Sequence, residues 1–513
     1  MPNAVDEKRW LILAVLCVSV LLVGVDNTIV NVALPTLSEQ LKATNTDLQW
    51  IVDGYSLPFA GLLLAGGGLS DRFGRKRIMQ SALLIFGLFS YFAARSNTIG
   101  ELLTSRALMG AAAAFIFPAT LSLLTTTFKD PSERAKAFGV WGATAGVAIA
   151  VGPIVGGELI SHFWYGSIFL VNIPIALFAF FVGALVVPES RGRSLHGFDL
   201  MGLALGTSSV TLLVLAIIQG PEWGWRSTST LGLFVASGAL LVSFARYELR
   251  KSAPLLDVRV FSNRAFSAGA GSIATSFFCL FGFIFLVTQY FQLIHGYSAL
   301  SAGVHTLPFA IVTMIITPLG AIAALRLGTR YVVSAGLVIM GIALFWMNFI
   351  GAKAAYFGPI MASMVVLAFV FSLINAPSTA AIMGSLRPDQ IGAGAAVNET
   401  TREIGGTMGV AVVGSVFSSL FGPQVRRAFA HLGLSPAQLN IAQSSTQAAK
   451  AVVAHVPQGI PLHAALTSSV VSSFINGFHR GCLVAAFAAV VVGLVVYRFL
   501  PKRVAPSEQL VEA

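Results

Sequence analysis

The chain has 513 residues, of which 56% are hydrophobic and only 10% are charged. Soluble proteins carry roughly 25% charged residues, so this composition excludes an ordinary soluble domain. The net charge of +11 does not by itself indicate nucleic acid binding, because basic residues also decorate the cytoplasmic loops of membrane proteins. Apolar runs of about 20 residues recur along the chain, and each can cross a bilayer as a helix. The sequence therefore predicts an all-α polytopic membrane protein.

Fourteen spanning helices are expected in chain order. They lie at 10–35, 48–69, 77–95, 100–124, 134–161, 165–187, 199–219, 228–248, 265–293, 301–325, 330–350, 355–383, 391–421 and 471–499. The first helix follows Lys8 and Arg9, as a signal peptide would, but it is too long for one and has no small-residue cleavage site. We expect it to stay in the protein.

The fourteen helices imply a domain organisation. Its predicted parts are a tail 1–9, a six-helix bundle 10–187, two inserted helices with a linker at 188–264, a six-helix bundle 265–499 and a tail 500–513. A long external loop is expected at 422–470, with a surface helix starting at Ser435 and Pro436. Most of the 32 Lys and Arg fall in the termini and the even-numbered loops. The positive-inside rule then places both termini in the cytoplasm.

Asp26 stands inside the first apolar run, where a carboxylate costs at least a few kcal/mol. Asp53, Arg106, Glu399 and Glu403 also lie within predicted helices. Such residues indicate a polar cavity that binds a proton or a cation. Asp26, Asp53 and Arg106 lie at similar depths from one side, so we expect them to share a pocket open to that side.

Glu399 and Glu403 are four residues apart and therefore share one helix face. Arg402 lies beside them and can neutralise one of the two carboxylates. Two interpretations stay open for this group: a site that handles cations and protons, or an interhelical salt-bridge cluster. Glu158, near the end of the fifth helix, is expected to be an exposed carboxylate at the membrane interface.

A glycine-rich basic turn follows the second helix. Its residues are Gly68-Leu69-Ser70-Asp71-Arg72-Phe73-Gly74-Arg75-Lys76-Arg77. Glycine permits a tight turn, and Asp71 at a helix end can pair with basic groups in one conformation and release them in another. Arg326-Leu327-Gly328-Thr329-Arg330 follows the tenth helix as a similar basic turn, a faint internal repeat of the kind seen in transporters.

Small residues and a proline interrupt the fifth helix. The run Gly152-Pro153-Ile154-Val155-Gly156-Gly157 places glycines four residues apart, which allows close helix packing. Pro153 removes a backbone donor and bends the helix. A bent and closely packed helix can seal a cavity, although ordinary tight packing is the alternative interpretation.

The turn at 68–77 resembles the signature loop of the major facilitator superfamily. Arg106 resembles its fourth-helix arginine motif, and 152–157 resembles its antiporter motif. The segments at Asp26, at 50–55, at 169–174 and at 296–300 extend the likeness to the fourteen-helix drug:proton antiporters. The resemblance implies the major facilitator fold, with two six-helix bundles and two extra central helices. It also implies a bacterial cytoplasmic (inner) membrane.

In that family, acidic residues at the positions of Glu399 and Glu403 are implicated in cation and proton handling. Some members also carry an acid in the tenth helix, whereas 309–318 has none here, which puts the handling of divalent cations in doubt. The switch residues would be Gly68, Asp71, Arg72, Gly74 and Arg75. The coupling residues would be Asp26, Asp53, Arg106, Glu399, Arg402 and Glu403.

The expected activity is proton-coupled export of hydrophobic, cationic drugs, such as quaternary ammonium compounds, dyes or biocides. Export of an endogenous lipid or secondary metabolite is the alternative. No Walker-type motif is present, so the proton gradient is the expected energy source, and no cofactor or metal is expected. Cys17, Cys279 and Cys482 are spaced for neither disulfides nor metal. We expect a monomeric transporter, not an enzyme, whose partners are lipid, protons and a small molecule rather than nucleic acid.

Overall fold

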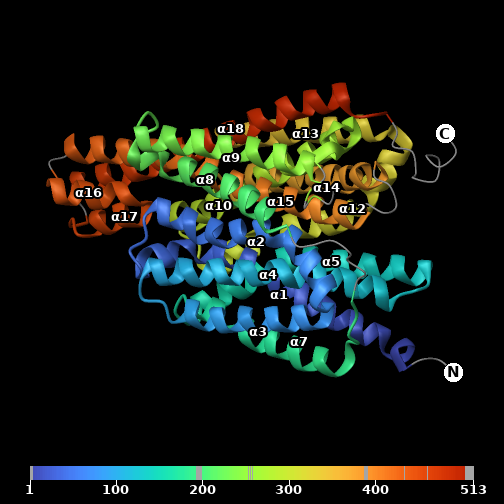
Figure 1. Ribbon diagram of the computed structural model, residues 1–513. Helices are drawn as coiled ribbons and strands as arrows, with labels where there is room; N and C mark the ends of the chain where they lie inside the picture. Colours follow the sequence, from blue (N-terminus) through green and yellow to red (C-terminus); the bar gives the residue numbers. More distant parts are fainter. Residues whose placement is uncertain are drawn as a thin grey trace.

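The computed structural model describes residues 4–191, 199–251, 254, 256, 258–385, 391–431, 434–458 and 460–502. Within these ranges, thirteen helical segments are long and apolar enough to cross a membrane. The helix Asn45–Phe73 (α2) runs among them and accounts for the fourteenth predicted span (Figure 1). The all-helical fold class predicted from the apolar runs is confirmed.

The first bundle contains α1 to α7. These helices are α1 (Ala4–Gln40), α2, α3 (Arg75–Ala94), α4 (Ile99–Thr127), α5 (Pro131–His162), and the short α6 (Ser167–Leu170) that leads into α7 (Asn172–Val186). Long apolar stretches drive these helices into the bilayer, and capping residues start several of them. Thr44 and Thr98, for example, begin α2 and α4 with reciprocal capping boxes.

The second bundle contains α10 to α18. Its spanning helices are α10 (Arg264–Gln289), α11 (Ala299–His305) with α12 (Leu307–Leu327), α13 (Thr329–Trp346), α14 (Met361–Gly384), α15 (Ile391–His431) and α18 (Pro461–Phe499). Short one-turn elements precede or follow some of them, namely η1 (Val258–Ser262), η2 (Tyr290–Ile294), η3 (Met347–Phe349) and η4 (Tyr356–Ile360).

The two bundles repeat one packing pattern. In the first, α1 packs on α5, α2 on α4, and α3 on α4 and α7; in the second, α10 packs on α15, α12 on α14, and α13 on α14 and α18. The turns at Gly74 and Gly328 also match, with φ of 111° and 97°. Each turn donates a hydrogen bond to the segment that follows the last helix of its bundle. In the first bundle Arg75 N donates to Ser190 O, and in the second Arg330 Nε donates to Leu500 O. The internal repeat predicted from two basic turns is therefore present in the fold.

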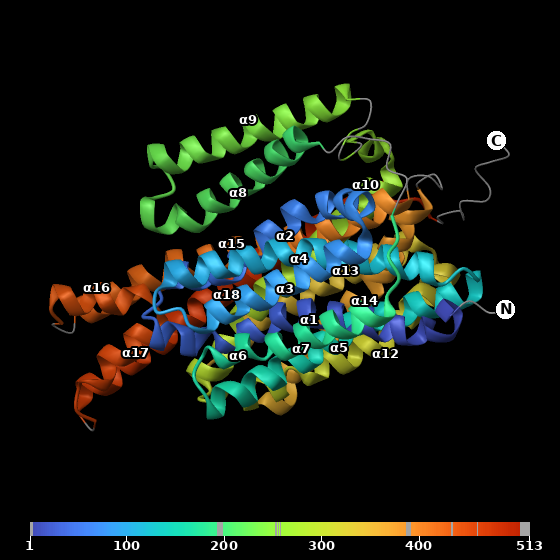
Figure 2. The same ribbon diagram turned by 60° about the horizontal axis from the view of Figure 1, so that its bottom comes forward.

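Two inserted helices, α8 (Leu200–Trp223) and α9 (Thr228–Arg250), lie beside the bundles (Figure 2). α8 contacts α2 and α15, so it covers the seam between the two bundles, and α9 packs mainly on α8. Asp199 caps α8 and accepts hydrogen bonds from Lys251 and Tyr247, which ties the start of α8 to the end of α9. Burial raises the pKa of Asp199, but the hydrogen bonds from Lys251, Gly202 and Tyr247 outweigh it and lower the pKa overall.

The segment 422–470 contains more helix than expected. α15 continues to His431 and α18 starts at Pro461, and between them lie α16 (Pro436–Ser444) and α17 (Thr446–Ala454). Ser435 caps α16 as its sequence predicts, but Ser445 starts a second helix instead of continuing the first. α16 and α17 extend beyond the bundles at the end opposite both chain termini (Figure 1). We call these two ends the hairpin end and the terminal end.

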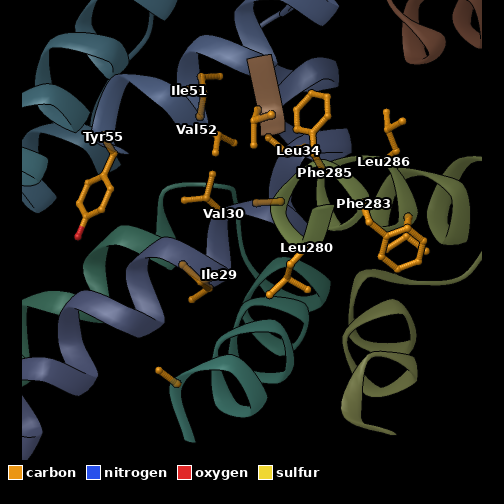
Figure 3. Close-up of a cluster of buried hydrophobic side chains, with 14 of the residues drawn as sticks. Ile29, Val30, Leu34, Ile51, Val52, Tyr55, Leu280, Phe283, Phe285 and Leu286 are labelled. Atoms are coloured by element: carbon orange, nitrogen blue, oxygen red, sulfur yellow. The ribbon is translucent and has the colours of Figure 1, made fainter. Parts of the chain in front are cut away.

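A buried apolar cluster joins the bundles. It includes Ile29, Val30 and Leu34 of α1, Ile51, Val52 and Tyr55 of α2, and Leu280, Phe283, Phe285 and Leu286 of α10 (Figure 3). α1 and α2 of the first bundle therefore share a core with α10 of the second.

Candidate functional site

A cavity of about 390 Å³ lies between the two bundles. Helices of both bundles line it: α1, α2, α4 and α5 from the first, and α10, α12, α14 and α15 from the second. Its aromatic wall consists of Phe59, Phe117, Trp141, Phe277, Phe281 and Phe371. Most of the lining is apolar, with amide and hydroxyl groups from residues such as Asn27, Asn31 and Asn375. Binding sites for small molecules commonly have this composition.

All three charged residues predicted in α15 reach this cavity. Arg402 Nη1 lies 2.8 Å from Glu399 Oε1, and the Arg402 guanidinium lies over the Phe277 ring, 5.5 Å from its centroid. Glu403 also lines the cavity, and among the described residues it has no ion-pair partner. With the three groups ionised, Arg402 balances Glu399, and Glu403 leaves the cavity one net negative charge. The salt bridge joins two residues of the same helix, α15, so it is not the interhelical cluster of the second interpretation, and an unpaired carboxylate lies beside it.

Asp26 lies outside the cavity, in a sealed cluster within the first bundle. Arg106 Nη1 donates to Asp26 Oδ2 at 2.5 Å, and Asn172 Nδ2 donates to Asp26 Oδ1 at 2.7 Å. Arg106 also donates from Nε to Ile51 O at 3.1 Å, and its guanidinium lies 4.4 Å from the centroid of the Tyr55 ring. The side chains of Asp26 and Arg106 are 0% and 1% exposed. This arrangement gives the buried carboxylate one cation as a partner and two hydrogen bonds.

Asp53 is equally buried but has no such compensation. It is 0% exposed, and neither of its carboxylate oxygens has a hydrogen-bond partner among the described residues. An isolated carboxylate in a dry site is far more costly than the neutral acid. This environment therefore fits the protonated form of Asp53.

The structure does not place Asp26, Asp53 and Arg106 in one open pocket, as their similar depths predict. Asp26 pairs with Arg106, none of the three lines the cavity, and Asp53 has no hydrogen-bond partner in the described part of the chain. The reason lies in the direction of α1 side chains. Successive residues of a helix point about 100° apart, so Asn27 faces the cavity while Asp26 faces the interior of its own bundle.

The glycine motif of α5 makes close contacts that can seal the hairpin end of the cavity. A Cβ atom at Gly156 would lie 2.5 Å from Ile29 of α1, and one at Gly157 would lie 2.4 Å from Leu300 Cα of α11. A Cβ atom at Gly152 would lie 2.0 Å from Thr28 Oγ1, and one at Gly303 of α11 would lie 2.2 Å from Pro153 O, which excludes a side chain at either position. The motif therefore brings α5 into backbone contact with both α1 and α11.

The part of α5 nearer the terminal end does not make such contacts. Gly139, Gly142 and Gly146 line the cavity, and no atom of the described residues lies within 4 Å of the position that a Cβ would take at each of them. The cavity is therefore closed toward the hairpin end and bordered by unfilled space toward the terminal end.

Gly157→Ala tests this seal. The added methyl group collides with the backbone of Leu300, and a strain of roughly 1–3 kcal/mol shifts the population away from the closed hairpin end about tenfold or more. In a cysteine-free background, Asn31→Cys in the cavity then reacts faster with an impermeant thiol reagent added on the hairpin side. Gly142→Ala is the matched control and leaves the rate unchanged. Equal rates for Gly157→Ala and Gly142→Ala would show that α5 does not form the seal.

The carboxylate of Glu189 holds the basic turn after α2. The carboxylate of Glu189 accepts the N–H groups of Lys76 and Arg77 at 3.1 and 3.2 Å, at the start of α3. The N-terminus of a helix favours negative charge in this way. Gly74 adopts a φ of 111°, and it also lies against Glu189. A Cβ atom at this position would be 2.9 Å from the carboxylate carbon of Glu189.

The other predicted switch residues differ in their surroundings. Gly68 is exposed and has open space around it, the Arg72 guanidinium lies 5.5 Å from the centroid of the Phe73 ring, and the Arg75 N–H donates to Ser190 O at 2.9 Å. The side chain of Asp71 lies outside the described residues.

Glu158 is exposed and pairs with His162 at 3.2 Å, as expected for an interfacial carboxylate.

Sequence reasoning missed three features of the site. Asn172 lies in the family-like segment 169–174, and its signal in the sequence is a polar residue directly before the apolar run of α7. Glu189 gave the signal of an acid directly after a predicted span. The contact between α11 and the glycine motif had no signal in the sequence, because it joins segments about 150 residues apart in the chain.

Comparison with known proteins agrees with this geometry. Residues 16–410 match the family model of the Major Facilitator Superfamily. The multidrug efflux pump LfrA of Mycolicibacterium smegmatis is 34% identical over 497 residues, which cover 96% of this chain and 97% of LfrA. The methyl viologen resistance protein SmvA of Salmonella typhimurium is 33% identical over 420 residues, covering 82% of this chain and 84% of SmvA.

A solved structure with the same fold is that of a bacterial homologue of the human lysosomal transporter Spinster, in an inward-facing and unoccupied conformation. Its TM-score is 0.69 at 16% identity, and the match covers 99% of this chain and 100% of that one. The fold, the family match and the efflux relatives agree, and they exclude an enzyme. The chain is a multi-pass membrane transporter that belongs to the major facilitator superfamily.

Proposed function

We propose that this protein is a proton-coupled antiporter that exports hydrophobic, cationic drugs or toxic compounds. The observation that carries the proposal is a combination of two groups. An aromatic cavity holds Glu403, which has no ion-pair partner among the described residues, and a separate buried carboxyl group, Asp53, has no hydrogen-bond partner among them. The first group suits an organic cation and the second suits a proton. The printed names of the relatives, multidrug efflux and methyl viologen resistance, support this substrate class.

The cavity suits flat cations for two physical reasons. Aromatic faces attract cations, by about 0.5–1 kcal/mol at exposed sites and by more where water is excluded. Glu403 adds a negative charge that has no ion-pair partner among the described residues, because Arg402 forms its ion pair with Glu399. This free negative charge attracts an organic cation.

Glu403→Gln tests the role of that charge. The change raises the KM for a monovalent organic cation about tenfold and leaves the KM for an uncharged substrate unchanged, because only the cation loses an attraction of about 1.4 kcal/mol. Transport by proteoliposomes over a range of substrate concentrations measures both values. Glu158→Gln, an exposed acid outside the cavity, is the matched control. An equal change in KM for both substrates would contradict the assignment.

The proposed cycle uses Asp53 as the proton carrier and the Asp26–Arg106 pair as a fixed element of the first bundle. With both termini in the cytoplasm, as the distribution of Lys and Arg predicts, the hairpin end is external and the described conformation faces inward. A proton taken from outside would return the empty protein to this conformation. Loss of that proton to the cytoplasm would then accompany binding of the next cation.

Export of a secondary metabolite remains a second candidate. The tetracenomycin C resistance and export protein of Streptomyces glaucescens is 30% identical over 509 residues. Vesicles that contain the purified transporter separate the two functions. Saturable uptake of organic-cation dyes supports drug export, whereas uptake of polyketide-type compounds alone supports metabolite export.

A further inference from the structure

A second groove lies on the surface of the helical bundle, apart from the cavity. A groove of about 740 Å³ runs between α15 and α18 and ends at the turn between α8 and α9. No residue that lines it also lines the cavity. The turn lies toward the hairpin end of the molecule (Figure 1).

The groove is polar at one end and apolar along its length. Arg480, Leu483, Val484 and Phe487 of α18 line it at the spacing i, i+3, i+4, i+7, so they form one helix face. The groove also contains Ser419 of α15 and Trp225 of the α8–α9 turn. Phe487 is 72% exposed toward the surrounding bilayer. A phospholipid has the same arrangement, with a charged head above an acyl chain.

Arg480 lies at the hairpin end of a long uncharged run of α18. Residues 481–497 of α18 carry no charge, and Arg480 and Arg498 flank them. This run spans roughly 26 Å as a helix, close to the ~30 Å thickness of the hydrocarbon core. Trp225, close to Arg480, is the residue type that favours this interface.

The donors in the groove are free to bind an anion. Among the described residues Arg480 has neither an ion-pair nor a hydrogen-bond partner, and it is exposed. Ser419 Oγ accepts from Trp225 Nε1 at 3.2 Å, which leaves its hydroxyl hydrogen available. Guanidinium and hydroxyl donors are well suited to the oxygens of a phosphodiester.

We propose that this groove binds an anionic phospholipid of the leaflet at the hairpin end. Arg480 and Ser419 hold the phosphate, and one acyl chain lies along Leu483, Val484 and Phe487. The bound lipid bridges the α8–α9 turn to α15 and α18. The site does not depend on the transported substrate or on proton coupling.

Native mass spectrometry of the purified protein tests the proposal, with phosphatidylglycerol and phosphatidylcholine of identical acyl chains as probes. The wild type retains phosphatidylglycerol in preference to phosphatidylcholine. Arg480→Gln weakens retention of phosphatidylglycerol at least about tenfold, because a charge-assisted contact is lost, and Arg480→Lys keeps most of it. Arg95→Gln, at the same end of the first bundle, is the matched control and has no effect.

Val484→Trp fills the apolar part of the groove without touching the charge. It lowers lipid retention as well, which keeps the test valid if Arg480→Gln fails to fold. Equal retention of both lipids by the wild type would overturn the proposal. Undiminished retention in both the Arg480→Gln and Val484→Trp proteins would also overturn it, as would a cross-link from Phe487→Cys to a second copy of the chain, since that copy would then fill the groove.

Discussion

Replacing Asp53 by Asn is expected to abolish uphill transport without destabilising the fold. The amide has the shape of the protonated acid but cannot release a proton. Both carboxylate oxygens of Asp53 are already without partners, so the substitution breaks no hydrogen bond among the described residues. Substrate exchange needs no net proton movement, so it stays within about threefold of the wild type, a difference below 1 kcal/mol.

Three measurements on the Asp53→Asn protein check this expectation: accumulation driven by a pH gradient, exchange at equal pH, and thermal unfolding in detergent. The informative result is loss of gradient-driven accumulation while exchange at equal pH and thermal stability are preserved. Glu158→Gln, which changes an exposed acid outside the cavity, is the matched control and keeps all three. If the Asp53→Asn protein still accumulates substrate against its gradient, Asp53 is not the proton carrier.

Replacing Asp26 by Asn is expected to act in the opposite way, mainly on stability. The change leaves the buried guanidinium of Arg106 without a counter-ion, and breaking a buried pair from one side costs about 3–5 kcal/mol. Removing both charges, in Asp26→Asn with Arg106→Gln, restores much of that loss, because no unpaired charge remains.

The four proteins of this double-mutant cycle are compared by thermal unfolding in detergent. The expected order of stability is the wild type first, then the double variant, then Asp26→Asn. Additive losses from the two single changes would show that the pair is not coupled. The same protein also distinguishes the role of Asp26 from that of Asp53. At a low temperature, where the Asp26→Asn protein is fully folded, it retains proton-linked transport.

The spanning helices were predictable from the sequence because each must be apolar over about 20 residues. The spacing of Glu399 and Glu403 likewise predicted a shared helix face, and both line the cavity. These are local properties of one helix, and they depend little on the rest of the fold.

The surroundings of Asp26 could not be predicted in the same way. Its depth follows from the sequence, but its direction depends on how α1 is rotated against α4 and α7, which supply Arg106 and Asn172. For the same reason the sequence could not say which of its 38 Phe form the aromatic wall. Rotation of helices within a bundle is set by tertiary packing and not by local pattern.

The most direct test is a pH measurement on the purified protein in liposomes without an imposed gradient. When an organic cation is supplied on the cytoplasmic face, the wild type moves protons in the opposite direction to the cation, and the Asp53→Asn protein moves none. Cation transport by the wild type with no accompanying proton movement, or an unchanged proton signal in the Asp53→Asn protein, would contradict the account.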